Sequence, residues 1–394
     1  MKLIYRLFSL LALLLVGSAS LQAQDEDPFP ELNYYLYQCN VTITSKIVQN
    51  GNVLKDALVA VFCGDEIRGK ETVGSGTQPD IAFITVHGNY LGKYQYLTFK
   101  VFTGGKIFTF NPNPSLDWED DCYIKYDQLV GSVKAPYIID ITPISLADRA
   151  DNTDLLTSLD GQTEDVALTD RTLYKDGKWN TICLPFDVEL SGSDLDGAVA
   201  RPLSDAYITG TTLNLTFGDA VETLKAGTPY IIKWAKADDY DVASADSRDI
   251  TNPIFTGVAL STETHYYDNG FSGDERVRFM GSYQSTAFDS KDRSILLMGS
   301  SNTLYYPKSG AGLGAFRAYF KIGDDDAVEA RRLTAFNIDF DDEGVVTGVI
   351  DQTVLPTSES QSPVWGYTLD GRKLSAKPTM RGIYINNSKK VVLK

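Results

Sequence analysis

Short stretches of alternating polar and apolar residues, each bounded by Gly, Asp or Pro, recur along most of this chain of 394 residues. The strictest is 212–217, Thr-Leu-Asn-Leu-Thr-Phe, which predicts a strand with one face toward water. Residues 96–102 and 106–110 predict a hairpin, because Gly104 and Gly105 supply the positive φ of a tight turn. No long segment of helical period separates these runs. We therefore expect an all-β protein built of antiparallel β-sandwich-like domains.

Interruptions of this pattern suggest how the chain is divided. An Asp-rich passage at 143–161 predicts a short helix or a connector, and 351–363 reads as a Ser-, Thr- and Pro-rich linker. We expect an immunoglobulin-like β-sandwich over 31–145, a second β-rich domain over 165–345 and a small β hairpin module over 364–394. In the last of these, Asp370-Gly371 is a hairpin turn signal.

Two apolar runs make more specific predictions. The run 57–63 is continuously apolar, as expected for a strand that is covered on both faces. The run 179–188 predicts a single strand of the second domain.

The first 23 residues predict a secretory signal peptide. Lys2 and Arg6 supply the positive start, 7–16 is an apolar run interrupted only by Ser9, and Leu-Gln-Ala at 21–23 is a plausible cleavage site. This run is too short for a spanning helix, which needs about 20 apolar residues. No later segment is long and apolar enough to cross a bilayer, so we expect no transmembrane segment after signal removal.

The net charge of −16 argues against a nucleic-acid partner, because phosphate binding needs clustered Lys and Arg. Within this acidic chain the tail is basic. Cys39, Cys63, Cys122 and Cys183 permit disulfides in an exported protein, but their spacing does not choose a pairing. Cys63 and Cys183 fit equally well as small buried apolar residues.

Three stretches carry a family resemblance. They are the tail segments 366–373, 381–385 and 389–392, the segment 171–186 with its continuations 227–234 and 315–320, and the segment 61–69. The tail segments resemble the C-terminal sorting domain of secreted and surface multidomain β proteins of Bacteroidota. The segment 171–186 and its continuations resemble a segment that is common in these proteins, and 61–69 resembles part of their N-terminal immunoglobulin-like module. The resemblance implies export to the periplasm and onward display or release by the type IX route, with the tail engaging the export machinery. It assigns no active site.

Catalytic motifs are missing from the sequence. It contains no G-x-S-x-G, H-E-x-x-H, P-loop or C-x-x-C pattern, so we expect no cofactor and no metal site. A triad would have to use His87 or His265, each of which fits better as a strand-end or loop residue. A pair of carboxylates needs no local motif and stays open.

The acidic clusters at 117–121, 324–326 and 339–343 lack calcium-loop spacing and fit solvated turns. Trp118 and the adjacent Asp117 are the candidate ligand contacts, because an aromatic ring in an acidic loop can stack on a sugar. The alternative is an aromatic side chain that covers the end of a sandwich.

We therefore expect a non-catalytic binding or adhesion protein with a glycan or protein ligand. We expect it at the cell surface, at the outer membrane or outside the cell, and the periplasm is the alternative location. A structural component that assembles through an exposed strand edge is the alternative. A carbohydrate-active enzyme with a carboxylate pair is the second alternative.

Overall fold

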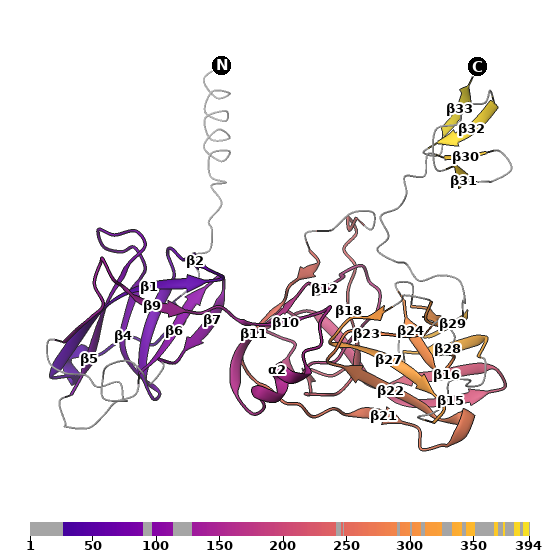
Figure 1. The fold of residues 1–394 in the computed structure, drawn as a ribbon, viewed down its shortest axis with the longest axis horizontal. Coiled ribbons are helices and arrows are strands. Elements are labelled where there is room, and N and C mark those ends of the chain that lie inside the picture. The colour runs from indigo at the N-terminus through magenta and orange to yellow at the C-terminus, as the bar shows by residue number, and fades with distance from the viewer. Residues whose placement is uncertain are drawn as a thin grey trace, which may run out of the picture. The chain divides into compact units, whose positions relative to one another are not determined.

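The computed structural model describes residues 27–89, 97–112, 128–241, 246, 248–289, 292–299, 302–308, 312–324, 333–340 and 344–350, and the tail strands at 366–368, 373–374, 382–386 and 389–393. Strands dominate the chain, which confirms the all-β prediction (Figure 1). The predicted signal peptide and the linker at 351–363 lie outside the described residues.

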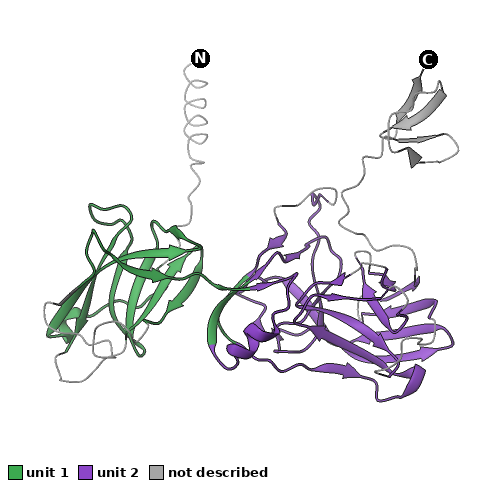
Figure 2. Cartoon of the chain, viewed as in Figure 1, with its two compact units in different colours: residues 1–145, 163–167, 254–259 green, residues 146–162, 168–253, 260–394 purple. Residues whose placement is uncertain are grey.

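Contacts divide the chain into two compact units, and the division is not linear in sequence (Figure 2). Unit 1 comprises residues 1–145 together with 163–167 and 254–259. Unit 2 comprises 146–162, 168–253 and 260–394. The short pieces of unit 1 are paired parts of β11 (Thr163–Thr169) and β20 (Ile254–Ala259).

Unit 1 is a β-sandwich. One sheet has β1 at its centre, pairing with β2 and β5 antiparallel and with β8 and β9 parallel. The other sheet has the order β4-β3-β6-β7. Val41, Ile84, Val59 and Phe99, from both sheets, share one buried core. The strands are β1 (Cys39–Gln49), β2 (Asn52–Val53), β3 (Leu58–Cys63), β4 (Glu66–Thr72), β5 (Ala82–Gly88), β6 (Thr98–Thr103), β7 (Lys106–Phe110), β8 (Gln128–Val130) and β9 (Tyr137–Asp140).

Strand β3 is covered on both faces, as its apolar run predicted. Val59 and Val61 face the sandwich core. Ala60 and Phe62, on the opposite face because side chains alternate, pack with Phe29 in a separate buried cluster. The hairpin of β6 and β7 is also confirmed, with φ of 57° at Gly104 and 73° at Gly105.

Unit 2 contains a second sandwich. One sheet has the order β13-β18-β15-β16-β28-β29 and the other the order β21-β22-β27-β24-β25. Their apolar residues, among them Leu215, Phe336, Phe279 and Phe320, form one buried core. The strands are β13 (Asn180–Ile182), β15 (Ala198–Thr209), β16 (Thr212–Phe217), β18 (Tyr230–Trp234), β21 (Tyr266–Asp268), β22 (Val277–Ser282), β24 (Ile295–Met298), β25 (Leu304–Tyr305), β27 (Arg317–Ile322), β28 (Ala335–Asp339) and β29 (Val345–Val349).

Two features of unit 2 differ from the sequence pattern. The long strand β15 was not anticipated, because Pro202 and two charged residues interrupt its apolar alternation and a bulge lies between Leu203 and Asp205. The predicted strand at 179–188 is wrong as one continuous element. It breaks after Ile182, where Cys183 donates its backbone N–H to Phe316, and Pro185 then lacks the N–H that a ladder needs.

Short elements complete the described chain. The helix α2 (Thr153–Ser158) occupies the Asp-rich passage and buries Leu156. The other elements are η1 (Tyr34–Leu36), η2 (Gly273–Glu275), β10 (Ile144–Ala147), β12 (Thr172–Leu173), β14 (Val188–Glu189), β17 (Thr223–Leu224), β19 (Ile250–Thr251), β23 (Thr286–Ala287), β26 (Gly312–Leu313), and the tail strands β30 (Gly366–Thr368), β31 (Lys373–Leu374), β32 (Gly382–Asn386) and β33 (Lys389–Leu393). Within the part of the chain described, no helix is both long and apolar enough to span a membrane.

Candidate functional site

The segment that precedes β1 is fastened to unit 1 at its first residues. The Phe29 ring packs edge-on against Phe62, with centroids 6.0 Å apart. Lys70, on β4, donates from Nζ to Asp27 Oδ2 at 2.7 Å and to Glu31 Oε1 at 3.0 Å. The segment is therefore held both by an apolar contact and by charge before it reaches η1.

Beyond these contacts three tyrosines of the segment and one histidine of β5 form a series of neighbouring rings, which we call the aromatic row: Tyr35, Tyr34, His87 and Tyr37. Tyr34 and Tyr35 have centroids 4.2 Å apart and planes inclined by 36°, and the Tyr34 hydroxyl donates to the Tyr35 hydroxyl at 2.9 Å. His87 lies 6.4 Å from Tyr34 and 6.2 Å from Tyr37. Tyr34 is 52% exposed, Tyr35 82% and the adjacent Leu36 61%.

Tyr37 fixes the inner end of the row. Its hydroxyl donates to the Ile67 carbonyl at 3.3 Å, and the Arg68 guanidinium lies 4.8 Å from its ring centroid. Arg68 is itself held by Glu66 at 2.9 Å and donates to the His87 carbonyl at 3.4 Å. The outer tyrosines are therefore exposed on a segment that is anchored on both sides.

The inner rings are uncharged at neutral pH. Burial lowers the pKa of His87, so the imidazole stays neutral. Burial and the nearby Glu66 carboxylate raise the pKa of Tyr37, so its hydroxyl stays protonated. The row thus offers neutral ring faces and hydroxyl groups, an arrangement suited to stacking and hydrogen bonding. Contiguous exposed apolar groups on an ordered segment are typical of interaction sites.

The predicted ligand contacts Trp118 and Asp117 lie outside the described residues, as does Cys122. His87 lies near the end of β5, and its ring belongs to the aromatic row. His265 is exposed, with Nε2 3.8 Å from Glu263 Oε2. Of the acidic cluster at 324–326, Asp324 accepts a hydrogen bond from the backbone of Gly273 at 2.9 Å.

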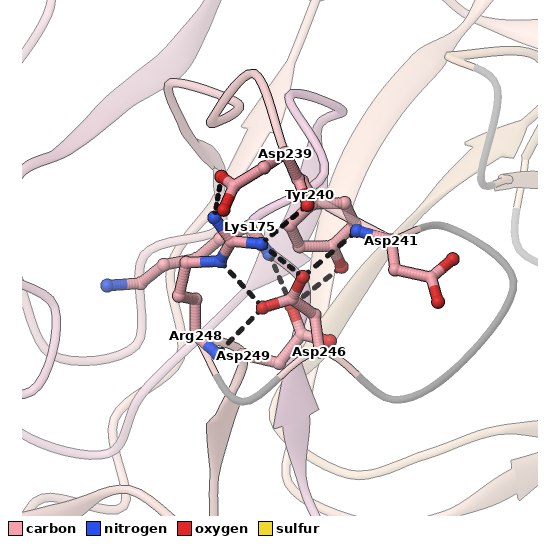
Figure 3. Close-up of polar contacts among 7 residues, drawn as sticks. All are labelled: Lys175, Asp239, Tyr240, Asp241, Asp246, Arg248 and Asp249. Carbon is pink, nitrogen blue, oxygen red and sulfur yellow. Dashed lines mark hydrogen bonds and ion pairs between the residues drawn. The ribbon is translucent and has the colours of Figure 1, made fainter.

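A different acidic cluster gathers around Arg248 in unit 2 (Figure 3). Arg248 donates from Nε and Nη2 to the two carboxylate oxygens of Asp246, at 2.7 and 2.6 Å, and from Nη1 to Asp239. The Asp249 carboxylate accepts from the Tyr240 hydroxyl at 2.7 Å. These carboxylates are engaged by the protein's own donors, so the cluster ties a loop together. Among the described residues no group of His, Cys, Asp and Glu is arranged to hold a metal ion.

Asp148 lies buried between two arginines of unit 2. Arg317 binds its carboxylate through Nε at 3.2 Å and Nη2 at 3.0 Å, whereas Nη1 of Arg171 stays 3.7 Å away. Arg171 is fully buried and donates from Nη2 to the Thr181 carbonyl at 2.8 Å. Its Nε and Nη1 have no hydrogen-bond partner among the described residues. Two cations, one of them fully buried, thus share one carboxylate, which is a structural arrangement with a high desolvation cost.

The described cysteines are free thiols. Cys39 and Cys183 are buried and Cys63 is half-buried. Burial raises the pKa of Cys183 to about 12, so it behaves as an inert apolar side chain rather than a nucleophile.

No family model, no curated protein and no solved structure matches this chain. The candidate site therefore rests on its own geometry.

The aromatic row was not identified from the sequence. The local signal was present as Asn-Tyr-Tyr-Leu-Tyr at 33–37, directly before the first strand. The contribution of His87, which is distant in sequence, required the fold.

Proposed function

We propose that this chain is an exported, non-catalytic binding or adhesion protein whose ligand docks on the aromatic row. The observation that carries the proposal is the exposure of Tyr35 on a segment that Phe29, Lys70 and Tyr37 fasten to unit 1. Tyrosine supplies a large contact area at a small cost in side-chain entropy, which is why it is enriched at binding surfaces.

The test uses the chain without its signal peptide, residues 24–394, on arrays of glycans and of extracellular matrix proteins. We expect retention of at least one ligand, and loss of that retention in Tyr35→Ala. The control variants are Tyr207→Ala and Tyr266→Ala, because these tyrosines of unit 2 are exposed outside the aromatic row, at 47% and 51%. Retention that survives Tyr35→Ala, or the absence of any retained ligand, contradicts the proposal.

Export by way of the tail belongs to the same proposal. We propose that the signal is removed after Ala23 and that the basic tail is processed during passage to the surface or medium. Intact mass of the cell-associated and released forms tests this. A released species ending near residue 350 supports processing, whereas a C-terminus at Lys394 in every form excludes it.

A second candidate is assembly through a strand edge. Strand β29 pairs with β28 and ends its sheet, and Val345 and Val349 are exposed on it. An uncharged edge strand without proline can accept a strand from another chain. Native mass measurement tests this candidate. A monomer at every concentration excludes it.

A further inference from the structure

We propose that the outer rings of the aromatic row bind the apolar face of an uncharged pyranose ring in a glycan. This inference rests on the proposed function and narrows it to one class of ligand. The site consists of Tyr34 and Tyr35, with Leu36 beside them.

The arrangement of the two outer rings is the first argument. The Tyr34 and Tyr35 rings are in tilted contact with centroids 4.2 Å apart, so part of one face of each ring is turned toward the other; Tyr35 is still 82% exposed, which leaves its other face open. A peptide that binds by its side chains needs pockets to receive them. An open ring face instead suits a ligand that is itself flat on one side. The C–H groups on one face of a pyranose carry partial positive charge, which the negative face of an aromatic ring attracts.

The hydroxyl groups are the second argument. The Tyr34 hydroxyl donates its proton to Tyr35 at 2.9 Å, which leaves the Tyr35 hydroxyl proton available to a ligand. A sugar presents hydroxyl groups at the rim of its apolar face, where this donor and the tyrosine oxygens can reach them. A purely apolar ligand would leave these groups unpaired, at a cost in binding free energy.

The charges around the row favour an uncharged ligand. Two described cations near the row are already engaged, since Lys70 is held by Asp27 and Glu31, and Arg68 is nearly buried and held by Glu66. Glu31 is almost fully exposed, and Glu66 is more than half exposed. An acidic polysaccharide would therefore approach the exposed carboxylates of Glu31 and Glu66 beside cations that these residues already hold, in a chain whose net charge is −16.

Stacking on one or two exposed rings is a weak interaction, so affinity for a single sugar will be low. A polymer presents the same sugar face many times, so a neighbouring sugar is at high effective concentration after the first has bound, and the overall affinity rises. The probes are therefore neutral polymers immobilised on a surface: a glucan, a mannan and a galactan. The comparison probes are an acidic polymer, alginate, and a proline-rich peptide.

The variants separate stacking from other roles of Tyr35. With a neutral polymer, Tyr35→Ala is expected to weaken binding about tenfold, as expected when an exposed aromatic ring that stacks on a ligand is removed. Tyr35→Phe keeps the ring face, so its affinity for the neutral polymer is expected to fall by no more than about threefold. Tyr207→Ala is expected to bind as the wild type does. Binding should change little between low and high salt, because the ligand carries no charge.

The outcomes also distinguish the two proposals. Tyr35-dependent binding to alginate or to the peptide, without binding to the neutral polymers, overturns the inference of an uncharged glycan and leaves the proposed function standing. A loss in Tyr35→Phe equal to that in Tyr35→Ala overturns stacking. Retention of no ligand by the wild-type chain overturns both.

Discussion

The buried pair around Asp148 gives the sharpest prediction about stability. Asp148 is 5% exposed, and its carboxylate is bound at 3.0 and 3.2 Å by Arg317 but lies 3.7 Å from Arg171. Arg317→Met therefore removes the hydrogen bonds to a buried carboxylate and leaves it only the Arg171 ion pair at 3.7 Å; breaking a buried pair costs about 3–5 kcal/mol. The Arg317 side chain is partly exposed, so we expect a loss of free energy of unfolding near the lower end, about 3 kcal/mol.

Arg171→Met is expected to cost less, although Arg171 is the more deeply buried residue. It removes one hydrogen bond to Thr181, worth about 1–3 kcal/mol when the carbonyl is left unpaired. It also removes a buried cation with two unpartnered nitrogens, whose pKa burial and the neighbouring Arg317 lower. The second effect offsets the first, so the net loss should be about 0–2 kcal/mol.

Urea unfolding followed by tryptophan fluorescence measures both losses, because Trp179 and Trp234 are buried in unit 2. The change in midpoint at constant slope gives the difference in free energy of unfolding. In an Asp148→Asn background the cost of Arg317→Met should fall to about 1 kcal/mol, because that substitution then leaves no buried carboxylate without its hydrogen-bonded arginine. The reasoning is refuted if Arg171→Met costs as much as Arg317→Met, or if the cost of Arg317→Met is unchanged in that background.

Three further predictions concern a close packing contact, the burial of two thiols and an ion pair. Gly281→Ala should destabilise it by about 1–3 kcal/mol, because a Cβ there would collide with Cys183 Sγ; an unchanged thermal midpoint would count against this packing. In the native protein at pH 8, iodoacetamide should label Cys63 well before Cys183, whose pKa burial raises to about 12; equal labelling rates would contradict this burial. Hydrogen bonds from Arg248 lower the pKa of Asp246, so its contribution to stability is present above the ordinary value of about 3.9 and is lost as the pH falls through the lower folded value. Asp246→Asn should therefore increase proteolysis near Asp239 and Arg248 at pH 7 relative to the wild type; equal cleavage of both proteins would refute the role of Arg248.

The sequence alone was sufficient for features that depend on neighbouring residues. The hairpin of β6 and β7 follows from two glycines between alternating strands, and β16 follows from strict alternation. The cover on both faces of β3 follows from its continuous apolar run, although the sequence did not show that Phe29 supplies part of that cover. Strand β15 was not predicted, because Pro202 and two charged residues interrupt the alternation of polar and apolar residues. The strand forms nonetheless, because it pairs with β16 on one side and β18 on the other.

What the sequence by itself determined is the all-β class, because side-chain alternation is a property of adjacent residues. What only the tertiary structure decided are the relations between residues far apart in the chain. Asp148 and Arg317, 169 residues apart, meet as a buried pair, and His87 joins tyrosines that precede β1. Whether a tyrosine is buried or exposed depends on the strands that pack around it, and Tyr35 became a candidate ligand contact only when its surroundings were known.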